Sequence, residues 1–198
     1  MTGLRVAMSL SMTVGVLASC GSSHVPAVVA AERARTPRGV TTIVEFIDFE
    51  CPFCRAMNEV LAPLVSARGA SVRVVRKHVP LTRIHPHAMD AARVSVCADA
   101  LGRGDSVADA LYRAPPQTLT KDGAIALAVA AGLDAGAVRA CVDDPATDTR
   151  IQGDTESFFV GADGDGVPTT WVDNRVFVGV ASQATLSGAI DRAIARAR

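Results

Sequence analysis

Apolar residues between positions 41 and 79 follow a strand, helix, strand pattern. Residues 41–49 are rich in β-branched and aromatic side chains and residues 71–79 are rich in valine, so both runs predict strands. Between them, 51–67 carries apolar side chains at helical spacing, with Pro52 in the first turn and Pro63 predicting a kink. This succession predicts two parallel strands joined by a right-handed crossover.

The following residues, about 86–160, carry mostly helical patterns. Ala-rich periodic stretches cover 87–101, 106–113, 121–132 and 135–142, and Gly, Pro and Asp-Pro signals separate them. Residues 169–172 and 175–180 then flank Asp173-Asn174, which predicts a β-hairpin, and an amphipathic stretch over 184–197 predicts a last helix. We therefore expect an α/β domain whose β-α-β and β-β-α halves are separated by an all-helical insertion.

The first nineteen residues have the pattern of a secretory signal. Arg5 precedes a mostly apolar, uncharged run over 6–17 that is too short to span a bilayer comfortably. The end of this run, Leu17-Ala18-Ser19-Cys20, resembles the bacterial lipobox, which implies that Cys20 is lipidated and becomes the first mature residue. A plain cleavage site is the alternative. Gly21 after the cysteine favours, by the same resemblance, the outer membrane.

Residues 20–39 lack a sustained period and contain Gly, Ser and two Pro, so we expect a lipidated cysteine followed by a flexible tether, with room for a helical turn or two over residues 27–35. The folded domain is then expected over 40–198. Its length suits one domain, and 49 % hydrophobic residues exclude disorder as the main state. Equal numbers of basic and acidic residues, 20 each, with only 4 % aromatics, argue against nucleic-acid binding.

The motif Cys51-Pro52-Phe53-Cys54 follows a predicted strand and opens a predicted helix. A Cys-x-x-Cys in this setting is typical of a redox site. Free amides and the dipole at a helix N-terminus stabilise a thiolate, so Cys51 is expected to be the surface-facing, attacking sulfur and Cys54 the resolving one. The alternative is half of a zinc site, but the sequence offers no second Cys-x-x-Cys, and His85-Pro86-His87 is the compact candidate that remains.

The segment Val44–Arg55, VEFIDFECPFCR, closely resembles the active site of DsbA-like thiol-disulfide oxidoreductases, in the branch with a DFxCPxC motif. The resemblance continues over about 40–195, in the segments Pro80-Leu81, Ile84-His85-Pro86, Gly132-Leu133-Asp134 and Gly166-Val167-Pro168-Thr169. It implies a thioredoxin fold with a helical insertion. It also implies a cis peptide bond at Pro168 facing the disulfide, with Val167, Pro52 and Phe53 contacting the substrate.

The same resemblance assigns further residues. Glu45 matches the buried acid that transfers protons to the resolving sulfur, and burial is expected to raise its pKa; an edge-strand Glu in solvent is the alternative. Asp48 and Glu50 are expected to be exposed. Cys97 and Cys141 match cysteines found in this branch, and we expect them to form a structural disulfide, with two separate buried thiols or a copper-binding pair as the alternatives. Phe53 stands where the strongest oxidants carry His, which implies a less oxidising disulfide.

Together these observations predict an exported enzyme, anchored by lipid on the periplasmic side of a bacterial membrane, that introduces disulfides into unfolded or reduced exported proteins. We expect a monomer without cofactor or metal that is re-oxidised by a quinone-linked membrane thiol oxidase of the DsbB or VKOR type. A periplasmic disulfide reductase or isomerase is the alternative within the class. A thiol-based metal-carrying lipoprotein and a non-catalytic surface lipoprotein are alternatives from other classes.

Overall fold

The computed structural model describes residues 25–162 and 164–198, so the predicted signal sequence and Cys20 lie outside the described residues. Within this part of the chain, four strands form one sheet in the order β2-β1-β3-β4. Its strands are β1 (Thr41–Ile47), β2 (Val72–His78), β3 (Thr169–Val172) and β4 (Arg175–Val178). As predicted, β1 and β2 are parallel, whereas β1–β3 and β3–β4 are antiparallel.

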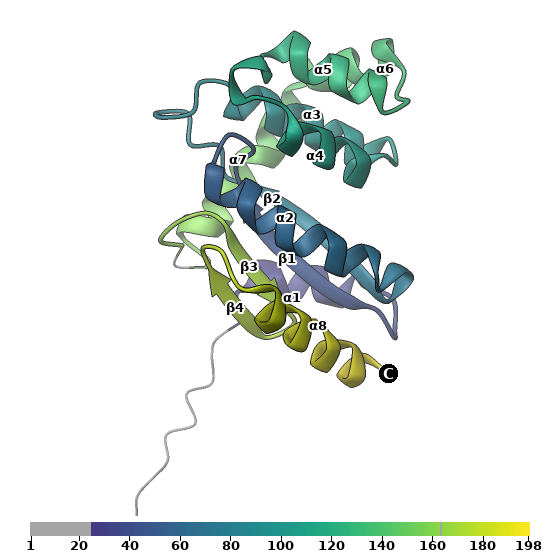
Figure 1. Ribbon diagram of the computed structural model, residues 1–198. Coiled ribbons are helices and arrows are strands. Elements are labelled where there is room, and N and C mark those ends of the chain that lie inside the picture. The colour runs from purple at the N-terminus through teal and green to yellow at the C-terminus, as the bar shows by residue number, and fades with distance from the viewer. Residues whose placement is uncertain (1–24, 163) are drawn as a thin grey trace, which may run out of the picture.

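Helices cover both faces of this sheet (Figure 1). One face packs against α2 (Pro52–Ser66) and α8 (Gln183–Ala197). Met57 of α2 and Leu186 of α8 pack there in one apolar cluster with Ile43 of β1. The other face packs against α1 (Ala27–Ala34) and α7 (Pro145–Phe159), around Phe46 and Phe158. All seven residues of β1 are buried, because this strand is central in the sheet and covered on both sides.

The helical insertion forms a second layer at one end of the sheet (Figure 1). It contains α3 (Ala88–Ala100), α4 (Gly104–Arg113), α5 (Lys121–Ala130) and α6 (Ala135–Val142). Short 3-10 turns at Gly69–Ser71 and Pro116–Thr118 complete the described elements. The core of the insertion is continuous with the end of β1 and the start of α2, since Ile47, Cys51 and Cys54 belong to the same apolar cluster as Leu111 and Val138.

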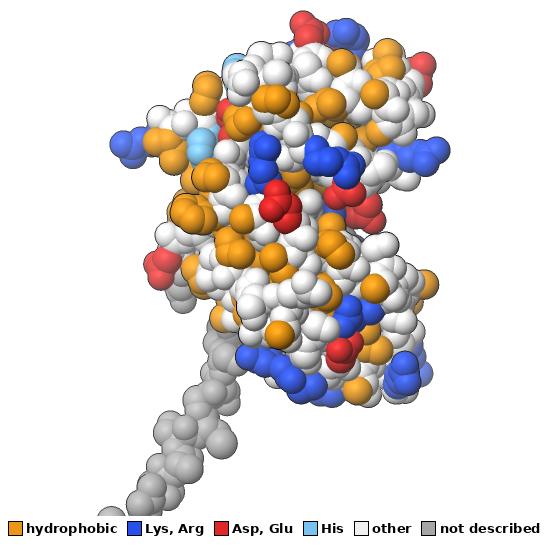
Figure 2. Space-filling model, viewed as in Figure 1, with side chains coloured by type: hydrophobic (Ala, Val, Ile, Leu, Met, Phe, Trp, Pro, Cys, Tyr) orange, Lys and Arg blue, Asp and Glu red, His pale blue; other side chains and the backbone are white. Residues whose placement is uncertain are grey.

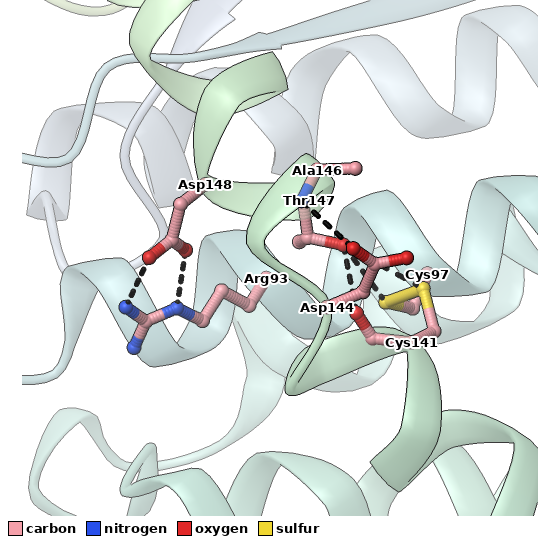
Figure 3. Close-up of a disulfide and its surroundings, with 7 residues drawn as sticks. All are labelled: Arg93, Cys97, Cys141, Asp144, Ala146, Thr147 and Asp148. Atoms are coloured by element: carbon pink, nitrogen blue, oxygen red, sulfur yellow. Dashed lines mark hydrogen bonds and ion pairs between the residues drawn. A yellow bond between two sulfur atoms is a disulfide. The ribbon is translucent and has the colours of Figure 1, made fainter.

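A disulfide between Cys97 and Cys141 ties α3 to α6 (Figure 3). Thr147 caps this bridge, because its hydroxyl donates to the Cys141 carbonyl at 2.7 Å. Nearby, the Arg93 guanidinium binds both carboxylate oxygens of Asp148 at 2.7 and 2.9 Å, which fixes α3 against α7. The cysteines are 44 positions apart, and closing a loop of that size stabilises the folded chain by about 4 kcal/mol in the chain-entropy model.

The helix α7 was not among the periodic stretches singled out by the sequence. Its fifteen residues are largely polar, and its buried residues, which include Asp154 and Ile151, do not form a broad apolar stripe. The local start signal is nevertheless present, because the Asp144 carboxylate accepts from the Ala146 amide and Pro145 occupies the first turn.

The segment expected to be a tether is in part a folded helix. Residues 27–34 form α1, and Val29 is only 1 % exposed against the sheet. Glu32 of α1 is also buried, and it binds Lys77 of β2 at 3.0 Å, while Lys77 binds Asp154 of α7 at 3.1 Å. These contacts join residues far apart in sequence, which is why local periodicity placed the start of the domain too late, near Val40.

Shortening Val29 to alanine is expected to destabilise the domain by about 2 kcal/mol, because the side chain is fully packed under α1. Val180→Ala is the matched control, since Val180 is 46 % exposed and the same change there removes little packing. Urea unfolding followed by circular dichroism measures both. Equal midpoints for the two variants would show that α1 contributes nothing to the fold.

Candidate active site

The two cysteines of the Cys-x-x-Cys motif lie where β1 passes into α2. Cys51 is the N-cap residue of α2, with extended backbone angles, and Pro52 begins the helix. The two sulfurs are free thiols in the structure. Cys51 is 5 % exposed and Cys54 1 %, so the predicted order of accessibility holds, but the attacking sulfur is more covered than a surface-facing residue.

The surroundings of the two thiols separate their acidities. Hydrogen bonds from the Cys54 thiol, and from the Cys54 and Phe53 amides, lower the pKa of Cys51 to about 6 against the opposing effect of burial. Burial, followed by the hydrogen bond with Cys51, raises the pKa of Cys54 far above its ordinary value. At neutral pH the reduced site therefore holds one thiolate, on Cys51, and one thiol, on Cys54.

A second segment of backbone faces the attacking sulfur. The Val167 carbonyl oxygen lies 3.8 Å from the Cys51 sulfur, although 116 positions separate the two residues. The Val167–Pro168 peptide bond is cis, as the resemblance implied. Pro52 and Phe53 are exposed beside the sulfur, with Phe53 at 64 %. The structure thus brings the predicted substrate-contacting residues together around Cys51.

Glu45 is buried in the middle of β1, at 3 % exposure, so the solvent-exposed alternative is wrong. Burial raises the pKa of this carboxyl, although Arg76 opposes that effect. Arg76 is the direct neighbour of Glu45 in the parallel register of β1 and β2. The Arg76 guanidinium donates to Asp105 of the insertion at 2.7 Å.

A cavity of about 270 Å³ reaches Glu45 from the surface between α2 and α4. Its polar lining includes Arg76, Asp105 and Asp109, and its apolar lining includes Leu61 of α2. A polar cavity of this size accommodates water, so the buried carboxyl has a route for proton exchange with solvent.

Asp48 and Glu50 were expected to be exposed, and this expectation is wrong. Asp48 is 2 % and Glu50 7 % exposed. The Asp48 carboxylate accepts from the Leu81 amide at 2.8 Å and lies 2.8 Å from the His85 ring nitrogen Nδ1. The Glu50 carboxylate accepts from the His87 amide at 2.7 Å. Both acids therefore hold the loop between β2 and α3, a contact that alternation along one strand does not reveal.

Asp48 also contacts the resolving cysteine. Its backbone amide donates to the Cys54 sulfur at 3.4 Å. The same residue thus connects the loop that carries exposed Ile84 to the buried sulfur of the Cys-x-x-Cys motif. Across residues 25–162 and 164–198, no group of three or more His, Cys, Asp or Glu side chains is placed to hold a metal ion.

A buried thiol, an acidified thiol at a helix N-terminus and a cis-proline backbone opposite define the site of a dithiol–disulfide exchange protein with a thioredoxin-like fold. The chain belongs to the family of DSBA-like thioredoxin domains, whose family model matches residues 42–191. This match confirms the predicted fold class, a thioredoxin-like α/β fold, and its family is one of thiol-disulfide oxidoreductases.

Solved structures show the same architecture. A thioredoxin-like oxidoreductase from Silicibacter pomeroyi is 27 % identical, with a TM-score of 0.67 over 79 % of this chain and 88 % of that chain. A probable DsbA oxidoreductase from Streptomyces coelicolor has a TM-score of 0.64 over 77 % of this chain and 89 % of that chain. At 20 % identity, the second likeness concerns the fold alone.

Curated relatives by sequence include sodium/proton antiporters named NhaA. The NhaA 3 protein of Salinispora tropica is 32 % identical over 168 residues, which cover 84 % of this chain and 25 % of that protein. The NhaA 1 protein of Mycolicibacterium gilvum is 42 % identical over 67 residues, which cover 34 % of this chain and 11 % of that protein. The chain thus spans a quarter or less of these two relatives. Among its described residues, no helix has the length and apolarity needed to cross a membrane.

Alkylation of Cys51 in the reduced protein is expected to follow a titration with its midpoint near pH 6, because the thiolate is the reacting form. Iodoacetamide labelling between pH 4 and 9, resolved by peptide mass spectrometry, measures the rate at each cysteine. Cys54 should stay unlabelled over this range, because burial keeps it protonated. A Cys51 midpoint above pH 8 would contradict the assigned environment.

Proposed function

We propose that the protein is an exported thiol-disulfide oxidoreductase that introduces disulfides into unfolded or reduced extracytoplasmic proteins. The observation that carries the proposal is the unequal pair of sulfurs, with the Cys51 pKa at about 6 and Cys54 buried as a thiol. A stabilised thiolate favours the reduced form of the enzyme, so substrate thiols readily reduce the Cys51–Cys54 disulfide and are themselves oxidised. This supports the oxidase direction over a reductase.

The enzyme enters the exchange in its oxidised form, with a disulfide between Cys51 and Cys54. A substrate thiolate attacks the Cys51 sulfur, a mixed disulfide forms, and the Cys51–Cys54 bond breaks with its electron pair on Cys54. A second substrate thiolate then attacks the substrate sulfur of the mixed disulfide and expels Cys51 as a thiolate. The substrate loses two electrons and two protons, and the enzyme gains the two electrons as a dithiol.

Glu45 is proposed to supply the proton that Cys54 takes up. Its raised pKa keeps it protonated near neutral pH more often than an exposed Glu, and the polar cavity beside it connects it with solvent. On re-oxidation the same group would accept the proton back. Arg76, the neighbour of Glu45 in the sheet, is proposed as a positioning residue that prevents the pKa from rising further.

The proposed location is the periplasmic side of a bacterial membrane, with Cys20 as the lipid attachment site and the outer membrane favoured. Support comes from the apolar run over 6–17 and the lipobox-like Leu17-Ala18-Ser19-Cys20. A quinone-linked membrane thiol oxidase of the DsbB or VKOR type would return the dithiol to the disulfide. The substrate strand is proposed to pair with the backbone at Val167, next to Pro52 and Phe53, with Pro168 holding that backbone in place.

The proposed function is tested by oxidation of a reduced, unfolded two-cysteine protein with glutathione disulfide as the terminal oxidant. The wild type should form the substrate disulfide, Cys51→Ala should be inactive, and Cys54→Ala should accumulate a mixed disulfide through Cys51.

In cells, alkylation and gel shift should find Cys51 and Cys54 mostly oxidised, with Cys97–Cys141 as the internal reference. A mostly reduced pair would favour the reductase or isomerase, and one bound zinc or copper per reduced chain would favour the metal carrier.

Glu45→Gln is expected to slow the steps that require proton transfer at Cys54 by about a hundredfold, since positioned acid–base groups typically contribute about 10²–10⁴-fold. Stopped-flow oxidation of the dithiol measures this effect, which should shrink as the pH is lowered, because wild-type Glu45 is then protonated and can no longer accept the proton of Cys54. The alkylation rate of Cys51 should stay within twofold of wild type. Glu59→Gln on the exposed side of α2 is the matched control. An unchanged pH profile in Glu45→Gln would remove Glu45 from the mechanism.

A further inference from the structure

The zero net charge of the chain conceals two parts of opposite sign. Residues 86–160, which include the helical insertion, carry six Lys and Arg against eleven Asp and Glu. Residues 25–85 carry nine basic against five acidic side chains. Charge of one sign that gathers on one part of a surface creates a field at that part, even in a protein that is neutral as a whole.

Much of the positive charge gathers at the end of the sheet where β1 begins. We define the basic end by nine arginines from α1 and its following loop, the C-terminal side of α2, the start of β2, β4 and α8: Arg33, Arg35, Arg38, Arg68, Arg73, Arg175, Arg192, Arg196 and Arg198. Arg33 and Arg196 line one cavity there with Thr41, the first residue of β1. Arg68 and Arg198 line a second cavity beside α8.

Three carboxylates at the basic end are already engaged. Asp173 binds Arg33 at 2.6 Å and Arg196 at 2.8 Å. Asp191 binds Arg68 at 2.7 Å. Glu32 binds Arg35 at 3.3 Å and Arg73 at 3.4 Å, in addition to Lys77.

Four arginines of the basic end are left over. They are exposed and make no ion pair with any residue that the structure describes: Arg38, Arg175, Arg192 and Arg198. An excess of unpaired guanidinium groups on one surface fits an external surface of negative charge.

The basic end and the active site lie at opposite ends of β1. The strand begins at Thr41, next to the cavity lined by Arg33 and Arg196, and ends at Ile47, shortly before Cys51. Seven strand residues rise by about 20 Å. Figure 2 shows the same separation, with Lys and Arg side chains along the lower end of the molecule and apolar side chains gathered higher on its left side.

We propose that the basic end binds an anionic phospholipid surface and so holds the domain with its active site directed away from the bilayer. The inference rests on the export and anchoring proposed above, but not on the direction of the redox reaction. Val25, the first described residue, packs with Phe46 and Phe158 at the start of α1, whereas Arg35 lies at the other end of this helix, in the basic end. Five positions separate Cys20 from Val25, and a chain of that length reaches at most about 18 Å, more than the roughly 12 Å length of α1. A lipid on Cys20 would therefore allow the basic end to reach the headgroups, and the charge of the basic end would select that orientation.

A bilayer explains this surface better than a nucleic acid does. The apolar run over 6–17 and Cys20 precede the domain directly. Stacking platforms for bases require exposed aromatic side chains, and aromatics make up only 4 % of this chain. Each basic residue near an anionic membrane surface strengthens binding about fivefold, and salt screens that attraction over a distance of roughly 8 Å at physiological ionic strength.

The test uses residues 20–198 with Cys20→Ser, so that neither the apolar run over 6–17 nor an acyl chain contributes to binding. The vesicles are phosphatidylcholine with or without 30 mol % phosphatidylglycerol, about one anionic lipid in three, which gives a substantial negative surface potential. Co-sedimentation should show at least tenfold tighter binding to the anionic vesicles. Raising the NaCl concentration to about 0.5 M should abolish this difference, because salt then screens the surface charge.

Matched triple variants identify the surface. Arg38→Gln, Arg192→Gln and Arg198→Gln together remove three leftover charges of the basic end and should lower the preference for anionic vesicles at least tenfold. Arg103→Gln, Arg113→Gln and Arg139→Gln remove three exposed charges from the insertion and should leave the preference within twofold. Both triple variants should keep the wild-type unfolding midpoint.

Three results would overturn the proposal: equal binding to both kinds of vesicle, equal loss in the two triple variants, or binding to an oligonucleotide without binding to anionic vesicles. The disulfide-exchange activity of the same samples is read in parallel. Loss of the proposed redox function would show there, without altering the vesicle result, so the two proposals fail independently.

Discussion

The buried carboxylate of Asp48 holds the catalytic end of the molecule together. A buried carboxylate needs hydrogen-bond donors, and this one obtains them from three directions: the amides of Glu50 and Leu81, and the ring of His85. The amide of the same residue donates to the Cys54 sulfur. Asp48 thereby positions three parts of the site: the turn into α2, the loop that precedes α3, and the Cys54 sulfur.

Two different electrostatic environments lie on either side of Asp48. On the side of Cys51, helix amides and the Cys54 thiol stabilise negative charge, whereas on the side of Cys54 and Glu45 burial opposes it. The helical insertion contributes to the second environment, because Asp105 of α4 pairs with Arg76 beside Glu45. The insertion is therefore part of the electrostatics of the site, in addition to covering the end of the sheet.

The parts of this structure that depend on local sequence could be predicted from it. Strand and helix periodicities located β1, α2 and β2, and the Asp173-Asn174 signal located the hairpin between β3 and β4, where Asp173 has a positive φ of 54°. The resemblance of the CPFC segment located the cysteines, and the same resemblance matched Glu45 to a buried acid, which its 3 % exposure agrees with. The rest depends on contacts between distant residues. Glu32 of α1 is held by ion pairs, and the carboxylates of Asp48 and Glu50 accept hydrogen bonds from distant backbone amides. Local periodicity contains no information about either kind of contact.

The bridge between Cys97 and Cys141 has a consequence for the order of events when the chain matures. Its sulfurs lie on α3 and α6, and Cys97 is completely buried once these helices have packed. Cys141, by contrast, is only partly buried, so in a folded molecule only the Cys141 thiolate can exchange with an outside disulfide, and Cys97 then completes the bridge from inside. Oxidation of this pair after folding therefore proceeds in a fixed order, from Cys141 inward.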